Sequence, residues 1–450
     1  MSINKDVNNN LSNASTILYS LQHLIFMVAN SAVVPVVVGI SLGLTTQEIA
    51  TFTQRTFIFV GLASVLQAVW GHRYPIVEGP AGIWYSTFIV LAGMAVQAGK
   101  PLSQLRTDLE MGLIISGIIL VLLGVFKLMP YIRKLFNPVV NGVFLIIMSL
   151  QFSTTIVKGM LIQAGTPNSA IEVDKLVVFI VSYGVTMVLS LKMKGFIKSV
   201  AILCGTALGW LFALIYGIAP NINGATMASG SLIKLPQVFA WGTPTFDFGV
   251  TLTCVITGIM VLSNLVASVV GMDELNKQEP SPKRYNRTVI VTGFGDIFAA
   301  FASAIGSVPY ASSIGFAAIT GVLSVKPFVI GSALLIILGF IPAVGSFFAS
   351  MPIMVGYSVL FSVFAVILGV GIKECFRDGL DTRQMLIIGV SIMCGNAVIY
   401  LPPHVFTKIS PSSAYLFGNG MIVAVGLAIL FEHVLFRAPK KAAVTANVKQ

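Results

Sequence analysis

The sequence predicts an all-α polytopic membrane protein whose spans form two inverted seven-helix repeats. The 450 residues are 56% apolar and only 10% charged, with a mean hydropathy of +0.92, whereas soluble domains carry roughly 25% charged residues. Apolar stretches of about 20 residues, long enough to cross a bilayer as helices, follow one another with short polar breaks. Motifs rich in proline and glycine recur in the same order in both halves of the chain.

These stretches predict about fourteen spans. They lie near residues 17–42, 50–70, 75–98, 110–130, 137–157, 176–192, 197–218, 247–271, 287–306, 309–325, 328–350, 352–373, 384–401 and 412–436. With the N-terminus inside, 20 of the 27 lysines and arginines fall on the cytoplasmic side. The positive-inside rule therefore predicts a multi-pass protein of the cytoplasmic membrane with both termini cytoplasmic. The net charge of +11 reflects this topology, so we expect no nucleic-acid partner.

The chain lacks the sequence patterns of soluble enzymes. The motifs HExxH and GxxxxGK[ST] are absent, as is a dinucleotide-binding fingerprint. The four cysteines show no metal-ligand spacing. Residues 1–15 have no basic and apolar leader with a cleavage site, so we expect the first span to direct the chain to the membrane. We therefore expect that the protein is not an enzyme and has no cofactor or metal site. If transport is coupled to a source of energy, we expect that source to be an ion gradient.

Two stretches interrupt apolar spans at matching places in the two halves. Aligning residue 18 with residue 247 places GPAGIWYS (79–86) over VPYASSIG (308–315), and NPVVNGVFLII (137–147) resembles MPIMVGYSVLF (351–361). Seven spans per half make the repeats inverted. Such paired breaks mark a transporter's binding site near the middle of the membrane, where half-helix N–H groups can face a ligand. A proline kink with serines bonded back to the helix is the alternative.

Ionisable residues inside predicted spans are costly and therefore candidates for function. Glu78, before the broken third span, and Asp296, inside the ninth, are candidates to carry a proton. Alternatively, Glu78 pairs with Arg73 at the membrane interface, and Asp296 caps the ends of the broken helices. His23 lies beside Gln22 in the first span, where it contacts a ligand, packs against its neighbours or hydrogen-bonds a neighbouring helix.

Other polar and aromatic residues lie close to the breaks or at span edges. Trp84 and Tyr310 flank the two breaks, where they either stack on a planar heterocycle or pack against neighbouring helices. His72, His404 and His433 lie at span edges, which predicts interfacial positions for them.

Together these motifs resemble the nucleobase–ascorbate transporter family, also called nucleobase:cation symporters. The resemblance covers residues 17–436. It rests on LQHLIFMVANSAVVPVVVG, the broken third span, NPVVNGVFLI and SIGFAAITG, and Gln22-His23 matches the Gln-His pair typical of the family. The chain is similar to divergent bacterial-type members, such as uncharacterised purine permeases.

The resemblance implies a fold of fourteen spans, with short extended segments in the third and tenth, and a homodimer. It divides the chain into a cytoplasmic tail (1–16), the core domain's first half (17–130), the gate domain's first half (131–218), an extracytoplasmic linker (219–246), the core domain's second half (247–350), the gate domain's second half (351–436) and a basic cytoplasmic tail (437–450). The two extended segments would meet in the core, with a nucleobase bound between them.

The family signature of the tenth span, [Q/E/P]-N-x-G-x-x-x-x-T-[R/K/G], falls on residues 312–321. Its glycine, threonine and final glycine are present as Gly315, Thr320 and Gly321. Ser312 and Ser313 stand where the family usually has Gln or Glu and then Asn. The chain therefore departs from the family at the two positions that usually contact the base.

The eighth span departs as well. Asn264 stands where the family usually has a glutamate that binds the base and takes part in proton coupling. Asparagine and serine can hydrogen-bond the edge of a base, but neither takes up a proton at physiological pH. If proton coupling persists, Glu78 or Asp296 supplies it.

The motifs and the resemblance together predict a secondary active permease. It would move a purine-type nucleobase such as xanthine, urate or guanine by proton symport and alternating access. The predicted substrate-binding residues are Asn264, Ser312, Ser313, Tyr310, Ala81, Gly82 and His23. Two alternatives stay open: a carrier of a benzoate-like or inorganic anion on the same fold, and an uncoupled channel or membrane sensor.

Overall fold

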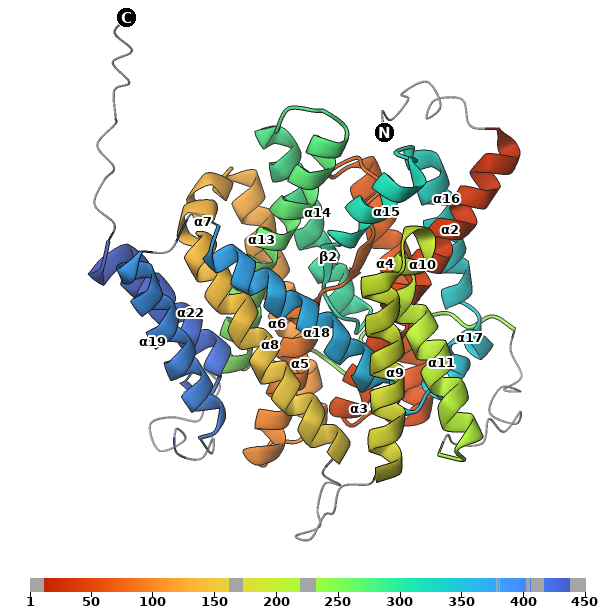
Figure 1. Cartoon of the computed structure of the whole chain (residues 1–450), viewed down its shortest axis with the longest axis horizontal. Helices are drawn as coiled ribbons and strands as arrows, with labels where there is room; N and C mark the ends of the chain where they lie inside the picture. The colour runs from red at the N-terminus through yellow and green to blue at the C-terminus, as the bar shows by residue number, and fades with distance from the viewer. Residues whose placement is uncertain are drawn as a thin grey trace, which may run out of the picture.

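The computed structural model describes residues 12–161, 173–218, 232–377, 379, 381–401, 405 and 417–437. These residues fold almost entirely as helices (Figure 1). Most of the predicted N-terminal tail and of the basic C-terminal tail lie outside the described residues, as do His404 and part of the predicted linker.

The first half of the chain forms ten helices and one strand among its described residues. They are α2 (Asn13–Ser31), α3 (Val33–Ser41), α4 (Thr46–Val69), β1 (Glu78–Pro80), α5 (Gly82–Gln97), α6 (Leu102–Val125), α7 (Met129–Leu135), α8 (Pro138–Leu161), α9 (Val173–Lys192), α10 (Gly195–Ser199) and α11 (Ala201–Ile215).

The second half repeats the order of long helix, strand and short helix. Its elements are α13 (Phe248–Leu275), α14 (Pro282–Phe301), β2 (Ser307–Pro309), α15 (Ser312–Thr320), α16 (Val325–Gly339), α17 (Pro342–Ala349), α18 (Ile353–Cys375), α19 (Thr382–Ile399), α22 (Gly420–Leu430) and the π-helix η1 (Phe431–Leu435).

The described helices have the length and composition of membrane spans. Seven are long and apolar enough to cross a bilayer, and the pair α16 and α17, bent by 82°, makes an eighth. Four shorter apolar helices lie among them. The prediction of a mostly helical polytopic membrane protein is confirmed, whereas the count of fourteen spans stays a prediction.

Local sequence signals define where helices begin. Thr45 and Glu48 form a capping box at the start of α4, in which each side chain satisfies a backbone N–H of the first turn. Asp247 caps α13 by accepting from the Val250 N–H at 3.0 Å, and the Lys100 ammonium lies 3.0 Å from the same carboxylate. Proline at residue 342 begins α17 beyond the bend, because proline favours the first turn of a helix.

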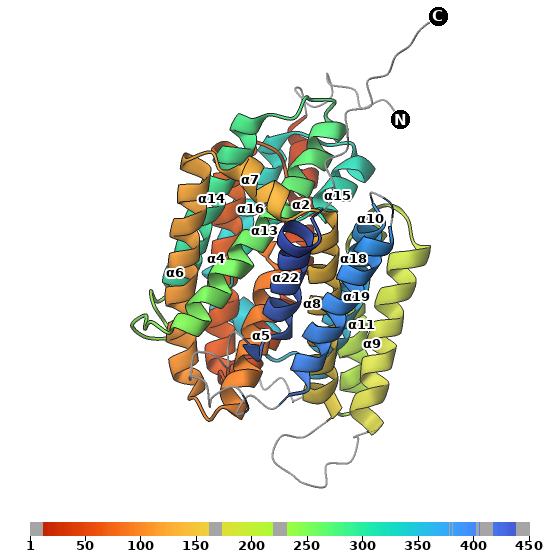
Figure 2. The ribbon, with the colours of Figure 1, turned by 90° about the vertical axis from the view of Figure 1, so that its left-hand side faces the viewer.

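The helices pack in two groups. In one group α6 packs against α13 and α14, and α16 packs against α2 and α4. In the other group α8 packs against α18, α9 against α11, and α19 against α22. Figure 2 shows α4, α6 and α14 on one side of the molecule and α9, α11 and α18 on the other.

Glycines allow α6 and α14 to approach closely. A Cβ atom on Gly117 would lie 2.5 Å from the Gly293 carbonyl oxygen, and one on Gly293 would lie 2.6 Å from the Gly117 oxygen. Small residues permit this backbone contact between membrane helices. The contact fixes the part of α14 that carries Asp296, one turn beyond Gly293.

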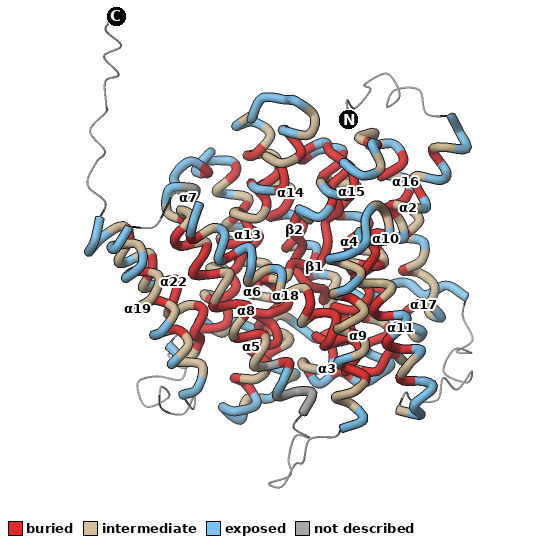
Figure 3. Tube along the Cα trace, viewed as in Figure 1, coloured by how far each residue is buried: buried red, intermediate tan, exposed pale blue. Residues whose placement is uncertain are grey.

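Buried residues concentrate in the middle of the molecule, whereas the peripheral helices expose apolar side chains (Figure 3). Only 22% of the most apolar stretch of α9 and 17% of that of α19 is buried. Leu191 on α9 and Met393 on α19 are 73% and 72% exposed. Such an apolar periphery suits lipid contact rather than water.

Two short strands occupy the predicted breaks in the third and tenth spans. β1 and β2 pair antiparallel, with Glu78 opposite Pro309, Gly79 opposite Val308 and Pro80 opposite Ser307. The pairing ends after three residues because proline has no N–H to donate to the ladder. The ribbon lies at the centre of the molecule, and each strand runs into a helix.

Candidate functional site

The ribbon directs two helix N-termini toward one place. Gly82 and Ser312 are the first residues of α5 and α15, and no side chain caps either helix. The Ala81 N–H donates to the Gly306 carbonyl at 3.0 Å, and the Tyr310 N–H donates to the Val77 carbonyl at 2.9 Å. These bonds fix the start of both helices, whose N-terminal ends carry partial positive charge.

A cavity of about 300 Å³ lies where the ribbon faces α18. It is lined by Ala29, Asn30, Val33, Val34, Pro80, Gly82, Tyr85, Ile202, Asn264, Val308, Tyr310, Ser312, Val359, Leu360, Val363, Val366 and Ile367. Four predicted site residues are among them: Gly82, Asn264, Tyr310 and Ser312. None of these described lining residues is acidic, basic or histidine, so amides, hydroxyls and backbone are its polar groups.

Tyr310 forms a fixed wall of the cavity. Its hydroxyl donates to the Pro80 carbonyl at 2.8 Å, and the Asn30 carbonyl lies 3.4 Å away. The ring lies directly against Gly79, because a Cβ atom there would be 2.3 Å from the ring carbon that bears the hydroxyl. Only glycine at residue 79 leaves room for the ring in this position.

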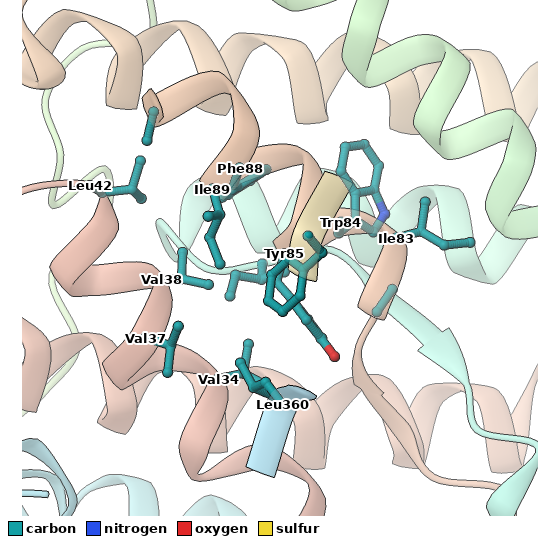
Figure 4. Close-up of a cluster of buried hydrophobic side chains, with 14 of the residues drawn as sticks. Val34, Val37, Val38, Leu42, Ile83, Trp84, Tyr85, Phe88, Ile89 and Leu360 are labelled. Atoms are coloured by element: carbon teal, nitrogen blue, oxygen red, sulfur yellow. The ribbon is translucent and has the colours of Figure 1, made fainter. Parts of the chain in front are cut away.

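The cavity also contains two polar residues that the sequence analysis did not single out. The Asn30 amide nitrogen donates to the Phe26 carbonyl at 2.7 Å, which leaves its oxygen free to accept from a ligand. Tyr85 stands edge-on to the rings of Phe152 and Phe364, with centroids 5.8 and 5.7 Å away. Figure 4 shows Tyr85 extending from α5 toward Val34 and Leu360. Its position one helical turn beyond Gly82 is the signal that predicts an orientation toward the break.

Three other predicted substrate-binding residues do not line the cavity. His23 is 2% exposed and packs against the rings of Phe316 and Phe328, with centroids 5.0 and 5.3 Å away. The Ser313 hydroxyl accepts from the Val77 N–H at 3.1 Å. Ala81 is fully buried. The structure places these residues in the framework around the ribbon, and a substrate role for them stays a prediction.

The two acids lie outside the cavity lining. Glu78 and Asp296 are fully buried, and the oxygens of both carboxyl groups lack hydrogen-bond partners of ordinary geometry among the described residues. A Cβ atom on Gly306 would lie 2.7 Å from Asp296 Oδ1 and 2.5 Å from Trp84 Nε1, so both groups border this glycine. Trp84, which is also fully buried, packs edge-on against Phe88 rather than lining the cavity.

The neighbour of Glu78 is His72 and not Arg73. The His72 Nε2 atom lies 3.4 Å from Glu78 Oε1, and both side chains are fully buried. An interfacial position for His72 is therefore wrong, since residues 70–77 fold inward from the end of α4. The signal that could have found the pair is the six-residue spacing between the histidine and a strand that starts with an acid.

A second, larger cavity of about 1210 Å³ lies between α13 and the helices α8 and α18. Its charged lining residues are Lys134, Lys373, Arg377, Arg437, Glu274 and Glu374. The four basic residues belong to the segments predicted to be cytoplasmic. We call this larger cavity the vestibule. Ser263 lines the vestibule and its neighbour Asn264 lines the smaller cavity, so consecutive residues of α13 border both spaces.

Comparison with known proteins gives this arrangement a family context. A sequence model described as "Permease family" matches residues 14–404. The "Putative purine permease YwdJ" of Bacillus subtilis (strain 168) is 32% identical over 422 residues, which cover 92% of this chain and 94% of that protein. The "Xanthine permease" of the same organism is 24% identical over 454 residues, with 97% of each chain covered.

The fold is also similar to a solved structure. The transmembrane domain of a cyanobacterium bicarbonate transporter, BicA, superposes with a TM-score of 0.63 over 93% of this chain and 98% of that one. The two sequences are 13% identical. This likeness concerns the fold alone.

Proposed function

This chain belongs to the permease family, the nucleobase–ascorbate transporters, and from that premise we propose that it carries a purine-type nucleobase through the cavity beside the ribbon. The observation that supports this most is the composition of the cavity lining. Asn30, Asn264 and Ser312 offer hydrogen bonds to a base edge, while Tyr85 and Tyr310 offer aromatic surface. Xanthine, urate and guanine are the expected substrates.

The lining suits a neutral ligand better than a charged one. A carboxylate or ammonium ligand in such a cavity would lack a countercharge from a side chain, and burying an unpaired charge is costly. A purine presents alternating N–H donors and carbonyl acceptors, which two amides and a serine hydroxyl can satisfy. The aliphatic side chains from α18 would cover the ring face opposite the ribbon.

We assign alternating access to motion of the two helix groups. The group with α4, α6 and α14 corresponds to the predicted core (17–130 and 247–350), and the group with α8, α9 and α18 to the predicted gate (131–218 and 351–436). In this proposal the fourteen spans form two inverted repeats, with the ribbon at their crossing point. The vestibule beside α13 would then be the cytoplasmic exit from the cavity.

Proton symport is part of the proposal, with Glu78 and Asp296 as the two candidate carriers. Their burial without ordinary hydrogen-bond partners supports this role, because an ionised carboxylate in such surroundings is unstable and a proton removes its charge. We also propose that the protein is a homodimer in the cytoplasmic membrane with both termini inside.

The test is uptake of radiolabelled xanthine into cells deficient in purine transport. Saturable uptake that collapses with a protonophore and is inhibited by urate or guanine supports a proton-coupled purine carrier. Uptake that saturates but ignores the protonophore removes the coupling and keeps the carrier. Absence of purine uptake from cells that display the protein in their membrane overturns the proposal.

A second candidate is an anion such as benzoate. The observation in its favour is the pair of uncapped helix N-termini at Gly82 and Ser312, since such ends attract anions. Labelled benzoate separates the two candidates. An anion carrier would accumulate benzoate, and purines would not compete with that uptake. A linear, non-saturable flux would instead favour an uncoupled channel or a membrane sensor.

A further inference from the structure

The segment that carries His72 is firmly held. Residues 70–77 connect α4 to β1, and the Tyr74 hydroxyl donates to Asp273 Oδ1 at 2.5 Å. Asp273, near the end of α13, also pairs with Arg284 on α14, whose guanidinium lies 4.8 Å from the centre of the Tyr74 ring. The segment is therefore anchored to two helices, and this anchoring fixes the position of His72.

A hydrogen bond determines which nitrogen of His72 carries the proton. The Tyr74 N–H donates to His72 Nδ1 at 3.0 Å, so Nδ1 acts as the acceptor. The neutral imidazole then has its proton on Nε2. This N–H faces Glu78 Oε1, which lies 3.4 Å from Nε2 on the first residue of β1. His72 is thus arranged as a donor toward Glu78.

Other polar groups around Glu78 complete the environment. Ser64 on α4 accepts from the Glu78 N–H at 3.0 Å, which fixes the backbone of the strand. Asp296 on α14 and Tyr310 beyond β2 are the titratable groups that act on Glu78, and Arg284 acts on His72. His23 on α2 instead packs against phenylalanine rings. Among the described residues, Ser307 on β2 and His72 are the two side chains that act as donors toward the Glu78 carboxyl group.

We propose that His72 is the positioning residue of a proton site on Glu78, so that the pair takes up and releases one proton behind the ribbon while the purine occupies the cavity in front of it. This inference rests on the proposed function. In uptake a proton joins a Glu78 carboxylate oxygen and forms an O–H bond. In release that O–H bond breaks and the proton returns to water, while His72 stays neutral and keeps its Nε2–H toward the carboxyl group.

The ribbon connects the proton site to the cavity. Gly79, the next residue after Glu78, lies against the Tyr310 ring, and the Tyr310 hydroxyl donates to Pro80. A movement of the Glu78 carboxyl group as its charge changes is therefore transmitted to Tyr310 through two consecutive strand residues. Proton occupancy and purine binding affect the same short backbone segment.

Infrared spectroscopy tests the proton site without depending on transport. The purified full-length protein in lipid is titrated from acidic to alkaline buffer, and the carbonyl stretch of protonated carboxylic acids is followed. We expect this band to contain a component that disappears on alkalinisation, is absent in Glu78→Gln and is retained in Asp296→Asn and Glu110→Gln, which replace the other two fully buried acids of the described residues. An acid-minus-alkaline difference spectrum that is unchanged in Glu78→Gln overturns the assignment. If Glu78→Gln fails to fold, Glu78→Asp keeps the carboxyl group, and the component should shift in frequency rather than disappear; an unshifted component in Glu78→Asp overturns the assignment.

His72 is tested by two substitutions in the same titration. His72→Phe removes the donor, so the midpoint of the Glu78 band should move to higher pH by about one to two units. His72→Gln offers an amide N–H and should restore a midpoint near that of the wild type. An unchanged midpoint in His72→Phe overturns the positioning role.

Transport measurements connect the site to the proposed function. Glu78→Gln should lose purine accumulation driven by a pH gradient and retain exchange of labelled for unlabelled purine. Glu48→Gln is the matched control, because glutamine preserves the capping box of α4. Gradient-driven accumulation in Glu78→Gln overturns the inference. Absence of purine transport by the wild type contradicts the proposed function instead, and the infrared titration still decides the proton site.

Discussion

The two strands of the ribbon have the same backbone plan and different chemistry. Each is three residues long, ends in proline and precedes a half-helix that starts at the cavity. β1 begins with a buried acid and is followed by α5, a helix of 16 residues. β2 is followed by Tyr310, Ala311 and the 9-residue α15, which begins with two serines. One half of the chain therefore supplies a buried acid to the ribbon, and the other supplies the hydroxyl groups of Tyr310 and Ser312 to the cavity lining.

The largest expected effect comes from disturbing the contact between Gly79 of β1 and the Tyr310 ring that follows β2. Gly79→Ala places a methyl group within 2.3 Å of the Tyr310 ring, whose hydroxyl is bonded to Pro80 and cannot easily move. We expect purine uptake to fall to background while the protein stays in the membrane. Gly93→Ala on α5, where no atom lies within 4 Å of the new Cβ, is the matched control and should transport normally.

The next effect concerns Asn264, which lies opposite the ribbon on α13. Asn264→Ala removes a donor and an acceptor from the cavity at once, so we expect purine uptake to be abolished at working concentrations. Uptake is measured together with the amount of protein in the membrane fraction. Near-normal uptake would remove Asn264 from the binding site.

Adjacent serines on the β2 side provide a finer comparison. Ser312 lines the cavity, whereas Ser313 accepts from Val77. Ser312→Ala should weaken purine binding by about fivefold through loss of one hydrogen bond. Ser313→Ala should leave binding unchanged and lower the thermal stability, because the buried Val77 N–H loses its acceptor. Binding and unfolding measurements on both variants would contradict this division if the two effects were exchanged.

The smallest expected effect is that of Tyr85→Phe on the β1 side. The ring keeps its edge-on contacts with Phe152 and Phe364, and only the hydroxyl is lost. We expect purine affinity to fall by about twofold to threefold with no change in stability. Isothermal calorimetry on the purified variant measures it, and an unchanged affinity would make Tyr85 an apolar wall of the cavity.

The sequence predicted the breaks better than it predicted the side chains around them. Gly/Pro motifs at corresponding places identify interrupted spans, and the two strands lie there. The sequence could not distinguish Ser312 from Ser313, because which of two adjacent serines faces the cavity depends on how α15 leaves the strand. Asn30 and Tyr85 were missed for a related reason, since apolar neighbours make them look like ordinary members of a span.

His72 illustrates a different limit. Hydropathy places a histidine next to Gly71 and Arg73 at the membrane surface, because polar residues near span ends usually face water. The segment turns inward because Tyr74 is bonded to Asp273, a residue 199 positions further along the chain. A contact of this range has no signal in the local pattern of the sequence.

The bond between Ser263 and Asn141 has a consequence for the resting state of the carrier. The Ser263 hydroxyl donates to the Asn141 side-chain oxygen at 2.9 Å, and it joins the helix that carries Asn264 to α8 in the opposite helix group. If the two helix groups move relative to each other in each transport cycle, this hydrogen bond must break once in every cycle. At about 1 kcal/mol it is too weak to stall the cycle. It is strong enough to shift the equilibrium between two conformations by about fivefold. Ser263 therefore affects the fraction of molecules in the conformation described here.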